Sequence, residues 1–105
     1  MILKSIKIIE FSESIRELNK FEMASQIFRS GTSIGANIRE AQNAESKADF
    51  IHKFKIAAKE ADEVEYWLRL CEESPFYPRP KIELHEDLKS IIMIISKIIS
   101  TSKNK

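Results

Sequence analysis

The sequence predicts an all-α protein, an antiparallel up-down-up-down four-helix bundle that forms a single domain over residues 1–105. Apolar residues recur at helical spacings of three and four in four successive stretches, no stretch alternates with the period of a strand, and the connections are short. The length of 105 residues is enough for one core but not for two. We therefore expect four helices around one core, each antiparallel to the next along the chain.

The first two helices are predicted over residues 3–18 and 20–43. The first has an irregular apolar stripe, in which Phe11 bridges a gap. The second has a start signal, because Asn19 followed by Glu22 has the spacing of an N-cap residue and its reciprocal partner. We therefore expect Asn19 to cap the second helix.

Both glycines of the chain, Gly31 and Gly35, lie within the predicted second helix, four residues apart. A glycine in a helix interior costs about 1 kcal/mol relative to alanine, so the pair indicates that another helix comes unusually close. The small residues Ala57, Ala58 and Ala61 of the third helix are the expected partners, since small side chains on both sides permit tight dispersion contacts.

The third helix is predicted over residues 47–73. Ser46 has the hydroxyl of an N-cap residue, and Asp49 suits the positive end of the helix dipole. Its expected core seam follows a regular three-four alternation and consists of Phe50, Phe54, Ala57, Ala61, Val64, Leu68 and Cys71. Prolines at positions 75, 78 and 80 end the helix in a loop, whose Phe76 and Tyr77 we expect to fold back over the core.

The fourth helix, predicted over residues 81–100, is apolar around more of its circumference than one core-facing stripe requires. With Leu84, Leu88, Ile91, Ile95 and Ile98 lining the core, the surplus residues face outward. The predicted surface between copies of the chain therefore consists of Ile92, Ile94, Ile99 and Trp67. The alternative is a fourth helix that is sunk more deeply into its own bundle.

The stretch over residues 29–68 resembles a bacterial family of four-helix bundle proteins that includes proteins encoded in 23S rRNA intervening sequences. The resemblance is carried by the motifs SIGANI, SKADF, KEADE and YWL. It implies an antiparallel four-helix bundle that assembles as a ring, commonly a pentamer, and it does not imply an enzyme. Related accessory proteins of diversity-generating retroelements form pentameric barrels whose basic surface engages nucleic acid and a reverse transcriptase.

Polar residues within this stretch predict a hydrogen-bonded line beside the apolar seam. Ser30, Ser33 and Asn37 lie at successive helical offsets, and we expect Glu60 and Glu63 to accept their hydrogen bonds while Arg29 or Arg39 balances the charge. The residues assigned to this structural signature are Arg29, Gly31, Ser33, Gly35, Asn37, Glu40, Glu60 and Glu63. The alternative is a small-ligand or anion site at the inner surface of the ring.

The charge balance excludes a general attraction to nucleic acid, because 17 basic and 16 acidic residues leave a net charge of +1. Four lysines nevertheless gather in the first half of the third helix, and in a ring they would form a basic rim able to contact RNA or DNA. These residues are Lys47, Lys53, Lys55 and Lys59. The alternative is an ordinary solvated helix face.

The sequence predicts no catalytic, cofactor-binding or metal-binding residues. A di-iron bundle needs paired acid-x-x-His motifs, and the chain offers only Asp49 with His52. Cys71 lies on the core seam, and a single cysteine suits a reducing cytoplasm. We expect no signal peptide, membrane span or small-molecule substrate. The predicted function is a non-catalytic, cytoplasmic, oligomeric scaffold, with a nucleic-acid-binding accessory module as the alternative.

Overall fold

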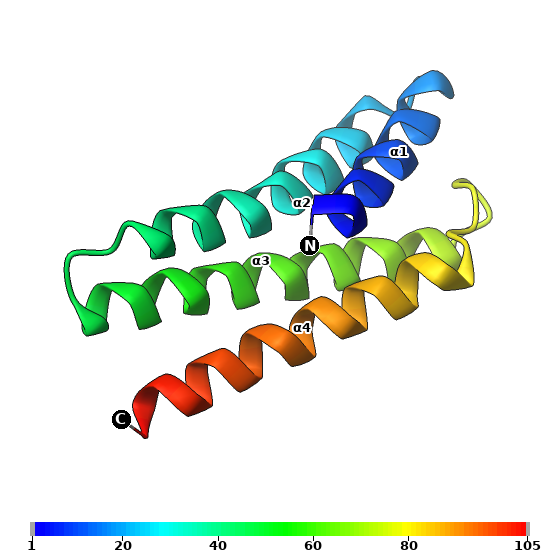
Figure 1. The fold of residues 1–105 in the computed structure, drawn as a ribbon. Coiled ribbons are helices and arrows are strands. Elements are labelled where there is room, and N and C mark those ends of the chain that lie inside the picture. Colours follow the sequence, from blue (N-terminus) through cyan, green and yellow to red (C-terminus); the bar gives the residue numbers. More distant parts are fainter. Residues whose placement is uncertain (1, 105) are drawn as a thin grey trace.

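The computed structural model describes residues 2–104 and consists of four helices: α1 (Ile2–Glu17), α2 (Phe21–Gln42), α3 (Lys47–Glu73) and α4 (Ile82–Lys103). They form an elongated antiparallel bundle of 47 × 20 × 19 Å, which confirms the predicted fold class (Figure 1). Each helix packs against the next along the chain, and α1 also touches α4 over a short stretch.

All four helices contribute to one core. The predicted seam of α3 is confirmed, since all of its residues are buried except Phe50, which is half-buried. On α4 the predicted core residues are buried except Ile98, which is also half-buried. The irregular stripe of α1 supplies Ile8 and Ile15, both fully buried.

The two predicted N-caps have different outcomes. The Ser46 cap is confirmed, because the backbone N–H of Asp49 donates to Ser46 Oγ at 3.0 Å. The Asn19 cap is wrong: Lys20 occupies the N-cap position of α2 without a capping side-chain hydrogen bond. Asn19 instead adopts a φ of 64° in the turn between α1 and α2. Asparagine tolerates this left-handed conformation better than most residues do, which explains its presence at a tight reversal.

The loop between α3 and α4 covers the end of the core with only one of its two aromatic residues. Tyr77 is half-buried against the core, and the ammonium of Lys20 lies 5.7 Å from the centre of its ring. Phe76 is 73% exposed, so the expectation that both rings fold back is wrong for Phe76.

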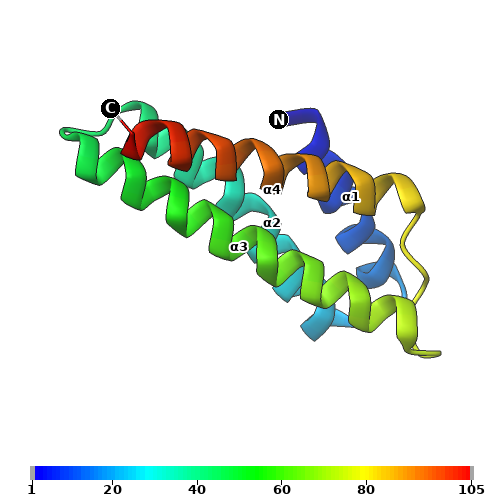
Figure 2. The same ribbon diagram turned by 90° about the horizontal axis from the view of Figure 1, so that it is seen from below.

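Helix α1 is the shortest of the four and does not extend along the whole bundle. Its first residues lie beside the middle of α4, so the last turns of α4 continue beyond it (Figures 1 and 2). A shallow hollow of about 410 Å³ opens beyond α1, with Ala41, Phe50 and Ser102 in its wall. A second hollow of about 300 Å³ lies along α4 at Ile94 and Ile98.

Gly31 marks the closest approach between two helices, but the partner differs from the predicted one. A Cβ at Gly31 would lie 2.7 Å from Cγ2 of Ile8 in α1, whereas a Cβ at Gly35 would come no closer than 4.0 Å to Ser5 Oγ. The predicted close approach is therefore confirmed at Gly31, and the expectation that the alanines of α3 make it is wrong. The glycine face of α2 is turned toward α1, while Ala57 and Ala61 are buried in the core.

This contrast predicts opposite effects for the two Gly→Ala substitutions. Gly31→Ala forces a methyl group into Ile8 and is expected to lower the free energy of unfolding by about 1–3 kcal/mol through overpacking. Gly35→Ala has room for its methyl group and is expected to raise that free energy by up to about 1 kcal/mol, because alanine favours the helix. Urea denaturation of both variants measures the difference, and equal destabilisation of the two would contradict the assignment.

Candidate functional site

Two side-chain contacts span the polar seam between α2 and α3. Ser30 Oγ donates to Glu63 Oε1 at 3.3 Å, which confirms Glu63 as an acceptor for this buried serine. The second contact is an ion pair between Lys53 of α3 and Glu40 of α2, in which Nζ lies 3.4 Å from Oε1. These contacts fix the register of α2 against α3.

The other residues of the predicted polar line bond within α2 and do not reach α3. Asn37 Nδ2 donates to the backbone oxygen of Ser33 at 2.8 Å, and Arg29 Nη2 donates to Gln26 Oε1 at 2.6 Å. The expectation that Glu60 accepts from this line is therefore wrong, and of the two arginines expected to balance the charge, Arg29 bonds to Gln26 instead. The physical reason is that polar side chains in a helix can hydrogen-bond to groups three or four residues away in the same helix, so they need not extend to a neighbouring helix.

Glu60 and Trp67 lie two turns apart on the flank of α3 that faces α2. Glu60 Oε2 and Trp67 Nε1 are both shielded from solvent, and neither has a hydrogen-bond partner among the described residues. Each such atom costs about 1–3 kcal/mol relative to a satisfied one. The Trp67 ring packs against the core and contacts Tyr66 edge-on, with ring centroids 5.1 Å apart. This flank of α3 is therefore held mainly by packing.

The structure separates the four lysines of the predicted basic rim. Lys53 is turned toward α2, as its contact with Glu40 shows. Lys55 and Lys59 are exposed one turn apart on the outer side of α3, and Lys47 is exposed in its first turn. At most three of the four lysines share a surface.

The isoleucines that were expected to face outward from α4 are on different sides of the helix. Ile94 is 41% exposed, whereas Ile92 and Ile99 are half-buried against the core. Ile92 and Ile99 follow His85 at intervals of seven residues, and His85 Nε2 lies 2.9 Å from Glu72 Oε2 of α3. They therefore face α3, and the expectation that they point outward is wrong.

Five exposed apolar residues lie on the first half of α1 and the middle of α4. The irregular stripe of α1 concealed them in the sequence, because apolar residues there point both inward and outward. We call this set the α1–α4 apolar patch, and it consists of Ile2 and Leu3 (each 75% exposed), Ile6 (41%), Met93 (64%) and Ile94 (41%).

Leu3 of α1 and Ile94 of α4 lie on the sides of their helices that meet at one seam. Asp87 of α4 lies beside α1, with its carboxylate oxygens 3.4 Å from Lys4 Nζ and 3.2 Å from Lys7 Nζ. Leu3 lies one turn before Lys7 on α1, and Ile94 lies two turns after Asp87 on α4. Because the two helices are antiparallel, both steps lead in the same direction along the seam.

The same ion pairs lower the pKa of the Asp87 carboxylate. The hydrogen bond from Lys7 and a second one from Lys4 hold the pKa of Asp87 below its ordinary value of 3.8. These are the ion pairs that link α1 to α4 among the described residues. α1 and α4 have little other contact, so these ion pairs are the main polar link between the two helices.

The reactive groups do not form a catalytic arrangement among residues 2–104. Cys71 is 1% exposed, and burial raises the pKa of its thiol to about 11, so it stays protonated and unreactive at neutral pH. Within that range no three His, Cys, Asp or Glu side chains gather in a way that would hold a metal ion. None of the described helices combines the length and apolarity needed to cross a membrane.

The fold and its polar seam define an all-α bundle protein whose internal polar contacts set helix register. The chain matches the 23S rRNA-intervening sequence protein family over residues 3–100, and it belongs to that family. It is also similar to a crystal structure from Bacteroides thetaiotaomicron, described as a protein of unknown function from the S23 ribosomal protein family. The two are 45% identical, the match covers 91% of this chain and 97% of the other, and the TM-score is 0.72. Comparison with curated proteins finds no match.

The Asp87 contacts predict a pH-dependent link between α1 and α4. Because the folded-state pKa is lowered, the stability that the link contributes is complete above the ordinary carboxyl pKa of 3.8 and is lost as the pH falls below it. Asp87→Asn is expected to lower the urea midpoint at pH 7 and to change it much less at acidic pH. Glu86→Gln, on an exposed neighbour, is the control, and equal effects of the two at pH 7 would refute the link.

Proposed function

We propose that this protein is a non-catalytic scaffold that assembles into a ring of identical copies, most consistent with a pentamer, by covering the α1–α4 apolar patch. The observation that carries the proposal is the patch itself, in which five large apolar side chains on two adjacent helices are exposed. Exposed apolar side chains gathered on neighbouring helices mark interaction sites on folded proteins. The pentamer is supported by the resemblance of residues 29–68 to ring-forming bundle proteins.

The energetics favour a patch that acts as the centre of a larger contact. Full burial of each apolar side chain is worth about 1.5–3 kcal/mol, while association costs about 4–15 kcal/mol in lost freedom of motion. The patch therefore offsets the cost of association only with further area around it, and stable interfaces bury at least about 1,000 Å² in total.

A closed ring with more than two members also needs a second, different surface on each copy, because head-to-tail contacts join unlike faces. A second apolar area lies at the other end of α1 and the start of α2. Leu18 is 55% exposed there, and Phe21 (52%) and Phe28 (41%) lie two turns apart on one face of α2. We propose that this area of one copy meets the α1–α4 apolar patch of the next.

Light scattering coupled to size exclusion tests the assembly. The wild-type protein is expected to have about five times the chain mass of 12.2 kDa, and the double variant Leu3→Glu with Ile94→Glu is expected to run as a monomer, because it places charges in the patch. Ile82→Glu is the matched control, since Ile82 is 69% exposed on α4 but lies outside the patch. A monomeric wild type, or a double variant with unchanged mass, would rule out this interface.

A nucleic-acid-binding accessory module is the second candidate function, favoured by Lys55 and Lys59, which are exposed one turn apart on α3. The near-neutral charge argues against strong binding. For a scaffold we expect little change in the fluorescence anisotropy of labelled RNA or DNA at moderate salt. Strong binding that falls steeply with salt and is lost in Lys55→Glu with Lys59→Glu, but kept in Lys89→Glu, would favour the accessory module instead.

A further inference from the structure

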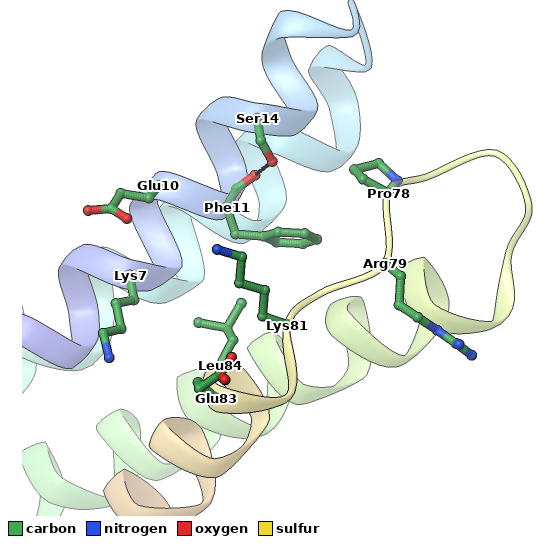
Figure 3. A pocket seen from close by; sticks show the side chains of 9 residues that line it. All are labelled: Lys7, Glu10, Phe11, Ser14, Pro78, Arg79, Lys81, Glu83 and Leu84. Carbon is green, nitrogen blue, oxygen red and sulfur yellow. Dashed lines mark hydrogen bonds between the residues drawn. The ribbon is translucent and has the colours of Figure 1, made fainter.

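A cleft of about 540 Å³ lies between α1 and the loop that leads into α4 (Figure 3). It shares no residue with the α1–α4 apolar patch or with the polar seam between α2 and α3. Its volume falls within the range of about 300–1,000 Å³ that is typical of small-molecule sites. The cleft exists because α1 and α4 are joined at Asp87 and diverge beyond it.

Part of the cleft wall is apolar, and it includes one aromatic ring. Phe11 is half-buried, and its ring extends from α1 into the cleft toward Pro78 of the loop (Figure 3). Leu84 lies on the α4 side and is only 5% exposed, so this wall is anchored in the core. Prolines at positions 78 and 80 restrict the loop backbone and hold the opposite wall in place.

Three cationic side chains line the cleft. The Lys81 side chain points toward the Phe11 ring, and Lys81 forms no ion pair with the described residues (Figure 3). Arg79 is also without an ion pair there, and its exposed side chain carries the guanidinium away from the ring. The third cation, Lys7, is engaged by Asp87 at 3.2 Å.

Two carboxylates also border the cleft, and they limit which anions fit. Glu10 is directed away from the Phe11 ring, whereas Glu83 lies at the start of α4 beside Leu84 (Figure 3). Lys81 is therefore the cation that lies beside Phe11 in the cleft (Figure 3), and the exposed Arg79 borders the loop side. An anionic group is favoured on the loop side of the cleft and disfavoured near Glu83.

We propose that this cleft binds a small aromatic phosphate of the nucleoside monophosphate class. A flat base can stack on Phe11, which every base permits because each has a π face. A phosphate monoester carries a charge of about −1.5 to −2 at pH 7, which matches the two unpaired cations Lys81 and Arg79. An inorganic anion leaves the apolar wall unused, and a neutral aromatic molecule leaves the cations unused.

The test is an NMR titration of the full-length protein, labelled with nitrogen-15, with adenosine monophosphate. Saturable shifts are expected for the amides of the cleft-lining residues Phe11, Arg79, Lys81, Glu83 and Leu84. Adenosine, which lacks the phosphate, and inorganic phosphate, which lacks the base, are each expected to bind at least about tenfold more weakly. The same spectra report whether the protein remains folded.

Charge-reversal variants assign the roles of the two cations. Lys81→Glu is expected to weaken binding of adenosine monophosphate about tenfold, and Arg79→Glu about threefold, because Arg79 is the more distant and more exposed cation. Lys89→Glu, on the exposed side of α4, is the control and should leave the affinity unchanged. Phe11→Leu keeps an apolar side chain while it removes the ring, and it should abolish the preference for adenosine monophosphate over ribose 5-phosphate.

Three results would overturn the proposal. One is the absence of shifts in the cleft amides of the folded wild type at millimolar adenosine monophosphate. Another is equal affinity for adenosine and adenosine monophosphate. The third is an unchanged affinity in a folded Lys81→Glu protein. None of these depends on the oligomeric state, so the outcome is separate from that of the ring proposal.

Discussion

The contact between Gly31 of α2 and Ile8 of α1 is the constraint on which the arrangement of this bundle depends. Because Gly31 has no side chain, Ile8 is accommodated directly against the backbone of α2, and a methyl group at that position would lie 2.7 Å from it. This contact fixes both the rotation and the height of α1. With Ile8 turned inward, Lys4 and Lys7 are brought to Asp87 of α4, while Ile2 and Ile6 are left outside. The position of the exposed apolar surface is therefore a consequence of one close approach inside the molecule.

The side of the bundle between α1 and α4 is the one least held by packing. α2 and α3 face each other along much of their length and are joined by Ser30 with Glu63 and by Lys53 with Glu40. α1 and α4 have little contact and are linked by a single carboxylate that accepts two lysines. Charged contacts near the surface contribute less than apolar burial does, so this side can present open surface without weakening the core. The cleft lies on one side of the Asp87 link and the apolar patch on the other.

Local signals in the sequence predicted the parts of the fold that depend on short-range rules. The bounds of α3, the Ser46 cap and the α3 seam follow from hydroxyl chemistry and from a regular three-four spacing within one helix.

The identity of the helix that meets Gly31 was not predictable in this way, since periodicity assigns a residue to a face but does not say which neighbour lies opposite. Ile92 and Ile99 show the same limit, because an excess of isoleucine on α4 has two explanations and the position of α3 decides between them. Asn19 fits two local motifs equally well, and the tightness of the turn selected the left-handed one. The cleft gave no signal, because Phe11, Pro78 and Lys81 are brought together only by the divergence of two helices that are far apart in the sequence.

The way α1 distributes its side chains argues for an assembly role over a purely internal one. A helix that only completes a core needs one apolar stripe, yet α1 has Ile8 and Ile15 fully buried and also has Ile2, Leu3 and Ile6 largely exposed. At a helix end that faces only water, isoleucine and leucine stabilise neither the helix nor the solubility of the protein. Lysine or glutamate at these positions would favour both. Apolar residues on two sides of a short helix are expected where it has two partners. The bundle supplies the inner partner through α2, and in the proposed assembly the outer partner is another copy of this chain. The exposed Phe21 and Phe28 of α2 are the surface with which we propose that this second copy binds.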